Sequence, residues 1–413
     1  MKKLKVRGSC GANIVKLSDI ADKKTTKNIL GLVTETFTNS AENGIISQTD
    51  FFDRTITNDK NISGYYIVDS DDFVYNPRIS TFAPVGPINR NKLGRPGVMS
   101  PLYLVFHIHD VEPEYLEWYF KSDAWHQFMR DNGNSGARSD RFSISDTEFF
   151  NMPIPLPEPS VQKIIAKTLS SLETKVVAEK TRVDKLKALK SAMLIKMFPK
   201  EGEKKPEIRF EGFTDDWEQR KLSDVATMHA RIGWQNLRTS EFLDSGDYLL
   251  VTGTDFEDGR INYATCHYVE RERYEQDKHI QLENGSILIT KDGTLGKVAY
   301  VQGLSMPATL NAGVFNVVIK DEKVVDEKYL FQYLKAPFLM DYVNKKATGG
   351  TIKHLNQNIL VDFPVVMPCV DEQALIGTYF ENLDHLITLH QRKYEKLIDL
   401  KKAMLEKIFG GDD

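Results

Sequence analysis

Few residues in this chain have the types and spacing that enzyme chemistry requires. Gly293–Val298, GTLGKV, is similar to a phosphate-binding loop, but its glycines are too close together and Val298 replaces the Ser or Thr that would hold magnesium. Tyr75–Arg78, YNPR, shares only part of the Asn-Pro-Pro-aromatic motif of amino-methyltransferases. His107 and His109 alternate on an expected strand with no third metal ligand nearby. The sequence therefore predicts no catalytic residues, no metal site and no cofactor in this chain.

Basic and amide side chains gather instead in segments that lack acidic residues. No Asp or Glu occurs within 73–109 or within 342–361, and 284–320 contains Asp292 alone. Basic and amide groups on glycine-flanked loops can bind phosphates and read base edges, and their recurrence in both halves favours binding over ordinary surface loops. The candidates are Arg78, Arg90, Lys92 and Arg95 in the first half, and Arg231, Arg238, Lys291, Lys297, Lys345, Lys346 and Lys353 in the second.

The elements that would position these residues occur twice. Residues 151–198 align without a gap with 362–409, a constant shift of 211 positions. The shift is 205 for the landmark pair KLSDIA and KLSDVA, which begin at Lys16 and Lys221, and 214 for YLEWYFK and YLFQYLK, which begin at Tyr115 and Tyr329. The loops SGARSDRFS and TGGTIKHLN also occupy corresponding places. We therefore expect one fold used twice, with divergent interiors.

Each copy of the repeat predicts a long helix, with Ser160 and Asp371 as the expected capping residues. A helix over 161–198 would be roughly 57 Å long and needs a partner of matching length. Two unrelated surface helices are the alternative, but the shared phase of their apolar residues favours a pair. The predicted seam comprises Leu169, Leu172, Val176, Val183, Leu186 and Met193 in the first helix, and Phe380, Leu383, Ile387, Tyr394, Leu397 and Met404 in the second.

The predicted fold class is α+β, that is, mixed α/β. Two globular units at 1–150 and 211–365 are each followed by a long helix, at 151–200 and 366–410, and 201–210 is a linker. The two helices would form an antiparallel coiled coil that relates the units by a pseudo-two-fold axis. Local two-fold symmetry in duplex DNA suits such a protein to a site that is read in two halves.

Composition describes a globular protein in a reducing compartment. The 413 residues include 41% hydrophobic and 27% charged residues, and the net charge of −4 means that any DNA-binding surface is local. No stretch approaches the roughly 20 apolar residues of a membrane span, and no secretory signal is evident, so we expect a cytoplasmic protein without membrane contact. Cys10, Cys266 and Cys369 are too far apart to suggest a zinc site or a disulfide framework.

The chain resembles the DNA specificity subunit of type I restriction-modification systems. The resemblance covers nearly the whole chain and is carried by GFTDDWEQRKLSDVA at 212–226, ATGGTIKHLN at 347–356, FPVVMPCVDEQALI at 363–376 and LKKAMLEKIF at 400–409. The first half has degenerate partners for these motifs. SGARSDRFS is less glycine-rich than its counterpart, and EPSVQ lacks the acidic residue that precedes Gln373.

The resemblance implies that each globular unit is a target-recognition domain for one half of a split site in double-stranded DNA. The paired helices would set the unspecified gap and dock two modification (methyltransferase) subunits, which bring S-adenosylmethionine and methylate adenine. Restriction (motor-nuclease) subunits would bring ATP and Mg. This chain would contribute specificity and no catalysis. Besides the basic residues above, the resemblance assigns DNA contacts to Arg138 and Arg141.

Three alternatives stay open at this point. The chain could serve a methyltransferase-only or related restriction complex, it could be an enzyme that acts alone, or it could be a coiled-coil scaffold that does not bind DNA. The missing motifs oppose the enzyme. The recognised bases and the gap length do not follow from the sequence, because side-chain identity without docking geometry does not determine readout.

Overall fold

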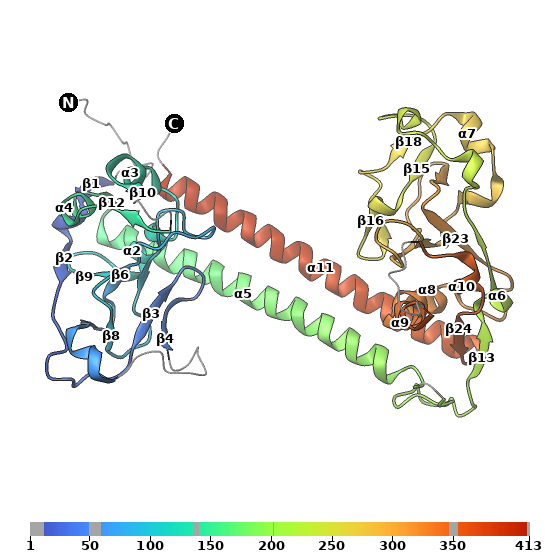
Figure 1. Cartoon of the computed structure of the whole chain (residues 1–413), viewed down its shortest axis with the longest axis horizontal. Helices are drawn as coiled ribbons and strands as arrows, with labels where there is room; N and C mark the ends of the chain where they lie inside the picture. The colour runs from blue at the N-terminus through green and yellow to red at the C-terminus, as the bar shows by residue number, and fades with distance from the viewer. Residues whose placement is uncertain (1–11, 49–58, 136–139, 201, 347–353, 411–413) are drawn as a thin grey trace. The chain divides into compact units, whose positions relative to one another are not determined.

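The computed structural model describes residues 12–48, 59–135, 140–200, 202–346 and 354–410. It is a mixed helix and sheet structure that divides into two compact units (Figure 1). Unit 1 comprises Met1–Lys180 with Arg392–Asp413, and unit 2 comprises Thr181–Gln391. Two long helices, α5 (Pro159–Lys196) and α11 (Val370–Phe409), each begin in one unit and end in the other.

The core of unit 1 is a four-stranded antiparallel sheet in the order β2-β9-β6-β7. Its register pairs Ala21 with Ile108 and Phe73 with Phe106, and the two phenylalanine rings stack with centroids 5.5 Å apart. Burial of these aromatic side chains drives the packing of the sheet against the short helices. The strands are β2 (Ala21–Lys24), β9 (Leu104–Ile108), β6 (Phe73–Tyr75) and β7 (Ile88–Arg90).

Smaller strand pairs and short helices complete unit 1. The pairs are β1 (Asn13–Lys16) with β12 (Pro153–Leu156), β3 (Phe37–Ser40) with β4 (Gly44–Ser47), β5 (Tyr66–Val68) with β8 (Gly97–Met99), and β10 (Asn134–Ser135) with β11 (Phe142–Ser143). The helical elements are η1 (Leu17–Asp19), η2 (Asp59–Gly64), α2 (Pro113–Phe120), α3 (His126–Asn132) and α4 (Asp146–Phe150).

Unit 2 repeats the four-stranded sheet and adds a second one. The repeated sheet has the order β14-β23-β20-β21, with β14 (Ala226–His229), β23 (Val314–Ile319), β20 (Ile287–Thr290) and β21 (Val298–Tyr300). The additional sheet has the order β18-β15-β22-β19, with β18 (His267–Tyr268), β15 (Leu249–Val251), β22 (Ala308–Leu310) and β19 (Gln281–Leu282). Two further pairs are β13 (Glu218–Lys221) with β24 (Pro364–Met367) and β16 (Phe256–Glu257) with β17 (Arg260–Ile261).

Short helices cover the sheets of unit 2. The α-helices are α6 (Leu222–Val225), α7 (Arg271–Glu275), α8 (Glu327–Lys335), α9 (Pro337–Lys346) and α10 (Gln357–Val361). The 3-10 helices are η3 (Gly233–Gln235), η4 (Thr239–Glu241), η5 (Gly253–Asp255) and η6 (Lys278–Ile280). The helix α8 corresponds to α2 of unit 1, and both bury tyrosine side chains beneath the repeated sheet.

Each unit is stabilised internally by the same set of long-range hydrogen bonds. In each, a backbone amide of the first helical turn and two tyrosine hydroxyls donate to carbonyls of the segment that precedes the long helix. Groups so far apart in sequence meet in the same way only if the two backbones follow the same path. The equivalent pairs are Leu17–Met152 with Leu222–Phe363, Tyr115–Pro155 with Tyr329–Val366, and Tyr119–Pro153 with Tyr333–Pro364.

Buried glutamines hold the starts of the long helices. Because α5 and α11 begin at Pro159 and Val370, the predicted capping residues Ser160 and Asp371 lie inside the first turn, two positions after the residues that precede the helices. In unit 1, Gln162 accepts from the backbone amide of Glu112 at 2.9 Å and donates to the Pro157 carbonyl at 2.8 Å. The corresponding residue of unit 2 is Gln373, which bonds Asp326 and Pro368 in the same way.

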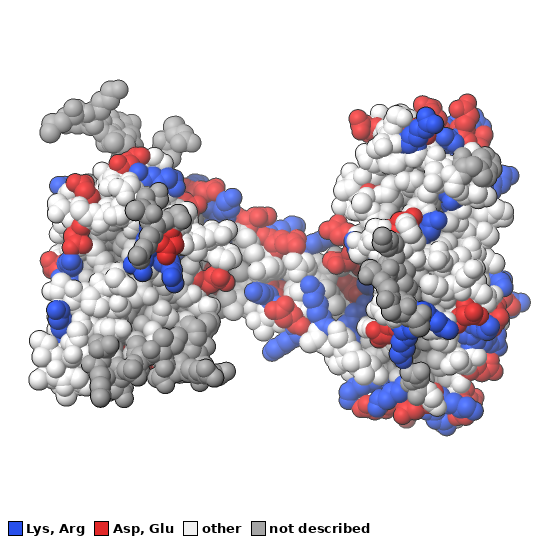
Figure 2. Space-filling view, viewed as in Figure 1, with Lys and Arg blue, Asp and Glu red and all other residues white. Residues whose placement is uncertain are grey.

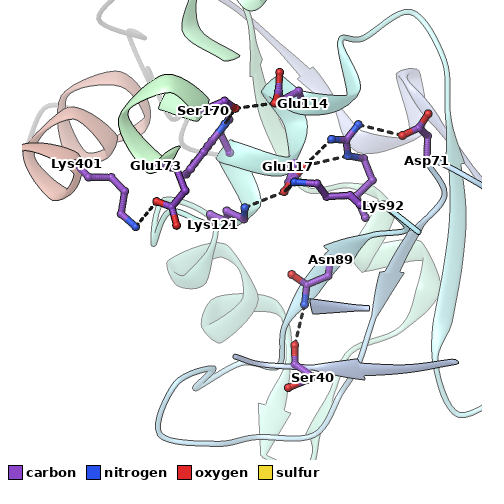
Figure 3. Close-up of polar contacts among 12 residues, drawn as sticks. Ser40, Asp71, Asn89, Lys92, Glu114, Glu117, Lys121, Ser170, Glu173 and Lys401 are labelled. Carbon is purple, nitrogen blue, oxygen red and sulfur yellow. Dashed lines mark hydrogen bonds and ion pairs between the residues drawn. The ribbon is translucent and has the colours of Figure 1, made fainter. Parts of the chain in front are cut away.

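The two long helices run antiparallel within each unit. In unit 1, Lys401 pairs with Glu173 at 2.7 Å, as Figure 3 shows, and Lys393 pairs with Glu179 at 2.6 Å. In unit 2, Lys190 pairs with Asp384 at 2.7 Å, and the Phe198 ring lies 6.0 Å from that of Phe380. Residue numbers rise along one helix as they fall along the other.

The residues of the predicted seam are covered to different degrees. Leu169, Leu172, Val176, Val183, Phe380 and Leu383 are buried, whereas Leu186, Met193, Ile387, Tyr394, Leu397 and Met404 are half-buried. A helix pair that lies at the edge of a domain leaves one side of its seam in contact with solvent. Leu169 belongs to the buried core of unit 1, and Phe380 and Leu383 belong to that of unit 2, so the globular bodies also pack on the helices at these positions.

Candidate nucleic-acid interface

Unit 1 carries two adjacent arginines on a groove of about 400 Å³. Arg78 and Arg141 form an isolated antiparallel bridge, so their backbones lie side by side, and both residues are exposed. The bridge is fixed by a hydrogen bond of 2.7 Å from the Phe142 amide to the Pro77 carbonyl. Two guanidinium groups at neighbouring positions repel each other unless an anion lies between them, so this place suits a phosphate.

Asparagine side chains organise the floor of this groove. Asn39 donates to the Val74 carbonyl at 2.7 Å, and Asn76 donates to the Asn39 carbonyl at 2.9 Å. Asn89 donates to Asn39 Oδ1 at 2.7 Å and to the Ser40 carbonyl at 3.1 Å, the second of which is drawn in Figure 3. These bonds fix the walls beside Arg78, which lowers the entropy cost of binding an extended ligand.

The corresponding groove of unit 2, of about 500 Å³, has a different charge pattern. The Leu355 amide donates to the Lys291 carbonyl at 2.8 Å, in the place of the Phe142–Pro77 bond of unit 1. Shifts of 214 and 213 positions then place Asp292 where unit 1 has Arg78, and His354 where it has Arg141. Asp292 Oδ1 lies 2.5 Å from His354 Nδ1, so an acid and base pair replaces the pair of arginines.

Three other predicted basic residues of unit 1 are held by carboxylates. Glu117, which is buried, accepts from Arg90 Nε at 3.0 Å, from Lys92 at 3.1 Å and from Lys121 at 2.8 Å (Figure 3). Burial by itself raises the pKa of Glu117, but the lysines and the arginine outweigh it and the pKa is lowered. Arg95 makes two bonds of 2.7 Å to Glu35. Arg78 and Arg141 differ from these residues in having no acidic partner among the described residues.

Arg231 is a packing residue in unit 2, in place of the DNA contact predicted for it. It is 2% exposed and donates to the Leu310 carbonyl at 2.9 Å and to Thr309 Oγ1 at 3.3 Å. Burial lowers the pKa of Arg231, and nearby Arg273 lowers it further. Composition alone could not reveal this, because its carbonyl partner lies 79 positions away.

The other predicted basic residues of unit 2 lie on its surface. Arg238, Lys297, Lys345 and Lys346 are exposed, and Lys291 lines the groove with its ammonium 5.5 Å from the centre of the Phe315 ring. Arg138 of unit 1 and Lys353 of unit 2 lie outside the described residues. Basic and acidic side chains intermingle on the visible face of both units in Figure 2, so the basic positions next to the grooves are local features.

Sequence reasoning missed the groups that give each groove its character. The asparagine floor of unit 1 and the Asp292–His354 pair of unit 2 were not among the candidates. A signal for the pair was present, since aligning SGARSDRFS with TGGTIKHLN sets Arg141 against His354. His107, considered above as a metal ligand, contacts buried Asp72 at 2.8 Å instead.

No group of three or more His, Cys, Asp or Glu side chains in the described ranges is placed to hold a metal ion. None of the helices in this part of the chain is both long enough and apolar enough to cross a membrane.

These features describe a duplicated framework that carries two different surface grooves. Residues 214–398 match the sequence model of the type I restriction modification DNA specificity domain. This match agrees with the resemblance inferred from the sequence motifs, and it covers residues 214–398 of the chain.

Similar proteins have names that agree with this domain. The MjaVIII type I specificity subunit of Methanocaldococcus jannaschii is 24% identical over 64% of this chain and 62% of its own length. The EcoBI specificity subunit of Escherichia coli is 21% identical over 63% of this chain and 58% of its own length. The matches thus span less than two thirds of these relatives.

Solved structures of this group share the fold. The S subunit of a type I restriction-modification system from M. genitalium aligns over 100% of this chain and 99% of its own, with 13% identity and a TM-score of 0.61. A chain from a study of complex assembly and conformational transition of the type I R-M system aligns over 98% of this chain and 99% of its own, with 16% identity and a TM-score of 0.52.

Proposed function

We propose that this chain is the DNA specificity subunit of a type I restriction-modification complex. Each unit reads one half of a bipartite site in double-stranded DNA, so that unit 1 and unit 2 act as two target-recognition domains. The match of residues 214–398 to the specificity domain supports this function for unit 2. The repetition of the same hydrogen-bonded framework extends the argument to unit 1.

The observation that carries the proposal is the contrast between the two grooves. Arg78 and Arg141 occupy the positions that Asp292 and His354 occupy in unit 2, on backbones that share the same closing hydrogen bond. A framework that stays constant while its exposed groups change suits recognition of two different half-sites. A scaffold without a ligand would have no use for this difference.

The two long helices are proposed to form one antiparallel coiled coil that sets the gap between the half-sites. This proposal is supported by an exchange of helix ends, in which each long helix begins in one unit and ends in the other. Phe198, near the end of the first helix, packs against Tyr329 and Tyr333 of unit 2, and Phe409 of the second helix packs against Tyr115 and Tyr119 of unit 1. Each globular body is thereby anchored to both helices.

The remaining parts of the activity are assigned to partner subunits. Two modification subunits, which we place on the long helices, would supply S-adenosylmethionine and methylate adenine, and restriction subunits would supply ATP hydrolysis with Mg. The role of this chain is to choose the DNA sequence. The proposal holds equally for a methyltransferase-only complex, which would lack the restriction subunits.

Genome-wide mapping of methylated adenines tests this function. The chain is produced in cells together with its modification subunit, and the expected product is methylation within two short specific sequences that an unspecified gap of fixed length separates. The same cells without this chain should show no such methylation. Methylation by this chain alone would identify an enzyme instead, and a complex that fails to shift duplex DNA in a gel would identify a scaffold.

A further inference from the structure

Phe82 is exposed on a turn of unit 1 that three hydrogen bonds close. Ser80 and Ala83 exchange two backbone hydrogen bonds of 3.1 Å, and Ser80 Oγ accepts a third, also 3.1 Å, from the Ala83 amide. Phe82 stands in this turn and is 71% exposed. Exposed apolar residues are common singly, but a turn closed by three hydrogen bonds holds this ring in one place at little further entropy cost.

The turn adjoins the groove that carries the arginine pair. Ser80 and Ile79 line the groove, and Arg78 lies four positions before Phe82. Leu102, a second apolar side chain on the same groove, is 62% exposed. The surroundings thus combine cations without described acidic partners and projecting apolar groups, and no Asp or Glu occurs anywhere in 73–109.

This combination fits duplex DNA better than a protein surface. Arginines of the adjoining groove can bind the phosphates on either side of a base step, while an apolar side chain enters between the bases and unstacks them. A protein partner would also need carboxylates to match the two arginines, and the apolar area of two side chains is far below the roughly 800 Å² per partner of a stable interface.

Unit 2 lacks this feature at the corresponding turn. The Asn76–Pro87 backbone hydrogen bond of unit 1 corresponds to the Thr290–Lys297 bond of unit 2, so the loop between these residues is four residues shorter in unit 2 and Phe82 has no counterpart there. Gly296, at the end of the shorter loop, has a φ of +70°, and a Cβ there would lie 2.1 Å from Met340 Sδ of α9. A projecting ring at this place is therefore a property of unit 1.

We propose that Phe82 inserts between stacked base pairs of the half-site that unit 1 reads, with Arg78 and Arg141 on the flanking phosphates. Insertion makes recognition there depend on how easily a base step unstacks, whereas unit 2 reads an undistorted half-site. This inference rests on the proposed function and assigns Phe82 as a specificity-determining residue within it.

The test uses the assembled complex of this chain with its modification subunits. The site found by methylation mapping is prepared as duplexes that carry 2-aminopurine at single positions of either half, leaving out the methylated adenines, because a methyltransferase unstacks those itself. We expect increased 2-aminopurine fluorescence at one step in one half-site only. Phe82→Ala should abolish the increase and weaken binding by about 10-fold, and Phe82→Trp should preserve both. Leu32→Ala, which removes an apolar side chain of unit 1 that is 80% exposed and lines neither groove, should change neither.

The outcomes separate this inference from the proposed function. A complex that binds the site with no fluorescence increase, with equal increases in both halves, or with an increase that survives in the Phe82→Ala variant would overturn the insertion of Phe82 and leave the function intact. A complex that does not bind duplex DNA would overturn the function itself. Circular dichroism of the variants checks that each is folded.

Discussion

Unit 1 and unit 2 hold opposite charge patterns at the same place in the same fold. The closing bond from Phe142 to Pro77, and its counterpart from Leu355 to Lys291, involve only backbone groups. The neighbouring side chains can therefore change from an arginine pair to Asp292 and His354 without loss of the framework. The comparison shows how a duplicated chain separates the residues that build it from the residues that recognise a ligand.

A second contrast lies where the bodies meet the long helices. Lys401–Glu173 in unit 1 and Lys190–Asp384 in unit 2 are equivalent pairs under the shift of 211 positions. The Lys190 side chain is 11% exposed, and it also donates to Gln332, whereas Lys401 and Glu173 are more accessible. The same interaction is thus a surface ion pair in one unit and a buried one in the other.

The largest expected effect is a loss of stability confined to one unit when the phenylalanine that anchors a long helix in that unit is removed. Phe198→Ala removes a buried ring from five aromatic neighbours in unit 2 and should cost about 3–5 kcal/mol of unfolding free energy. Hydrogen exchange followed by mass spectrometry should show loss of protection in α8 and β24. Phe409→Ala is the matched variant, for which the loss should lie in α2 and β12. Equal loss in both units for either variant would contradict an exchange of helix ends.

The next test gives unit 2 a residue that unit 1 already has. Glu372 is 0% exposed and makes two hydrogen bonds of 2.8 Å to Arg209, whereas unit 1 has Val161 at the equivalent position. Glu372→Val should destabilise unit 2 by about 3 kcal/mol, because it leaves the Arg209 guanidinium without its partner. Adding Arg209→Leu should recover most of the loss in urea unfolding. If stability does not recover, the Arg209 and Glu372 side chains contribute through their packing around the linker, in addition to their ion pair.

Charge exchange between the grooves tests the comparison directly. Arg78→Ala and Arg141→Ala should each weaken DNA binding about 10-fold and reduce the slope of log K against log salt by about 0.9. Conversely, Asp292→Arg and His354→Arg in unit 2 should make the slope of log K against log salt steeper. Filter binding at salt concentrations between about 50 and 200 mM measures this slope. Arg95→Ala is the control, since Arg95 is paired with Glu35, and a slope as flat as that of Arg78→Ala would reject the distinction.

The smallest expected effect is a pH dependence confined to unit 2. Burial, reinforced by Lys335, lowers the pKa of Lys190 to about 8. Burial alone would raise the pKa of Asp384, but Lys335 and Lys190 together lower it. Between pH 8 and the ordinary lysine value of about 10.4, the unfolded chain binds the Lys190 proton more tightly than the folded one. The free energy of unfolding should therefore rise with pH there, by at most about 1.4 kcal/mol per unit.

Variants isolate this contribution from the other groups that titrate in the same window. The wild-type curve minus that of Lys190→Met should rise between pH 8 and 10. Urea unfolding at successive pH values provides both curves. A flat difference for Lys190 would show that its ammonium is better compensated by Asp384 and Gln332 than its burial indicates.

The sequence by itself determined the repeat and the helices. A constant shift of 211 positions and apolar residues at helical spacing are local patterns, so they located α5 and α11 to within two residues at their starts. The KLSDIA and YLEWYFK landmarks likewise marked the framework, because the contacts they make recur in both units. The segments rich in basic residues could also be located from the sequence. The sequence could not show which of their basic residues remain available to a ligand.

Only the tertiary structure decided which basic residues remain available to a ligand. Arg90 and Glu117 are 27 positions apart, Asp292 and His354 are 62 apart, and Arg231 and its acceptor Leu310 are 79 apart. Composition of a segment cannot show which distant group will neutralise or bury a charge, because chain folding brings those groups together. Arg78 and Arg141 stand out for the same reason, since the bridge between them joins segments 63 positions apart.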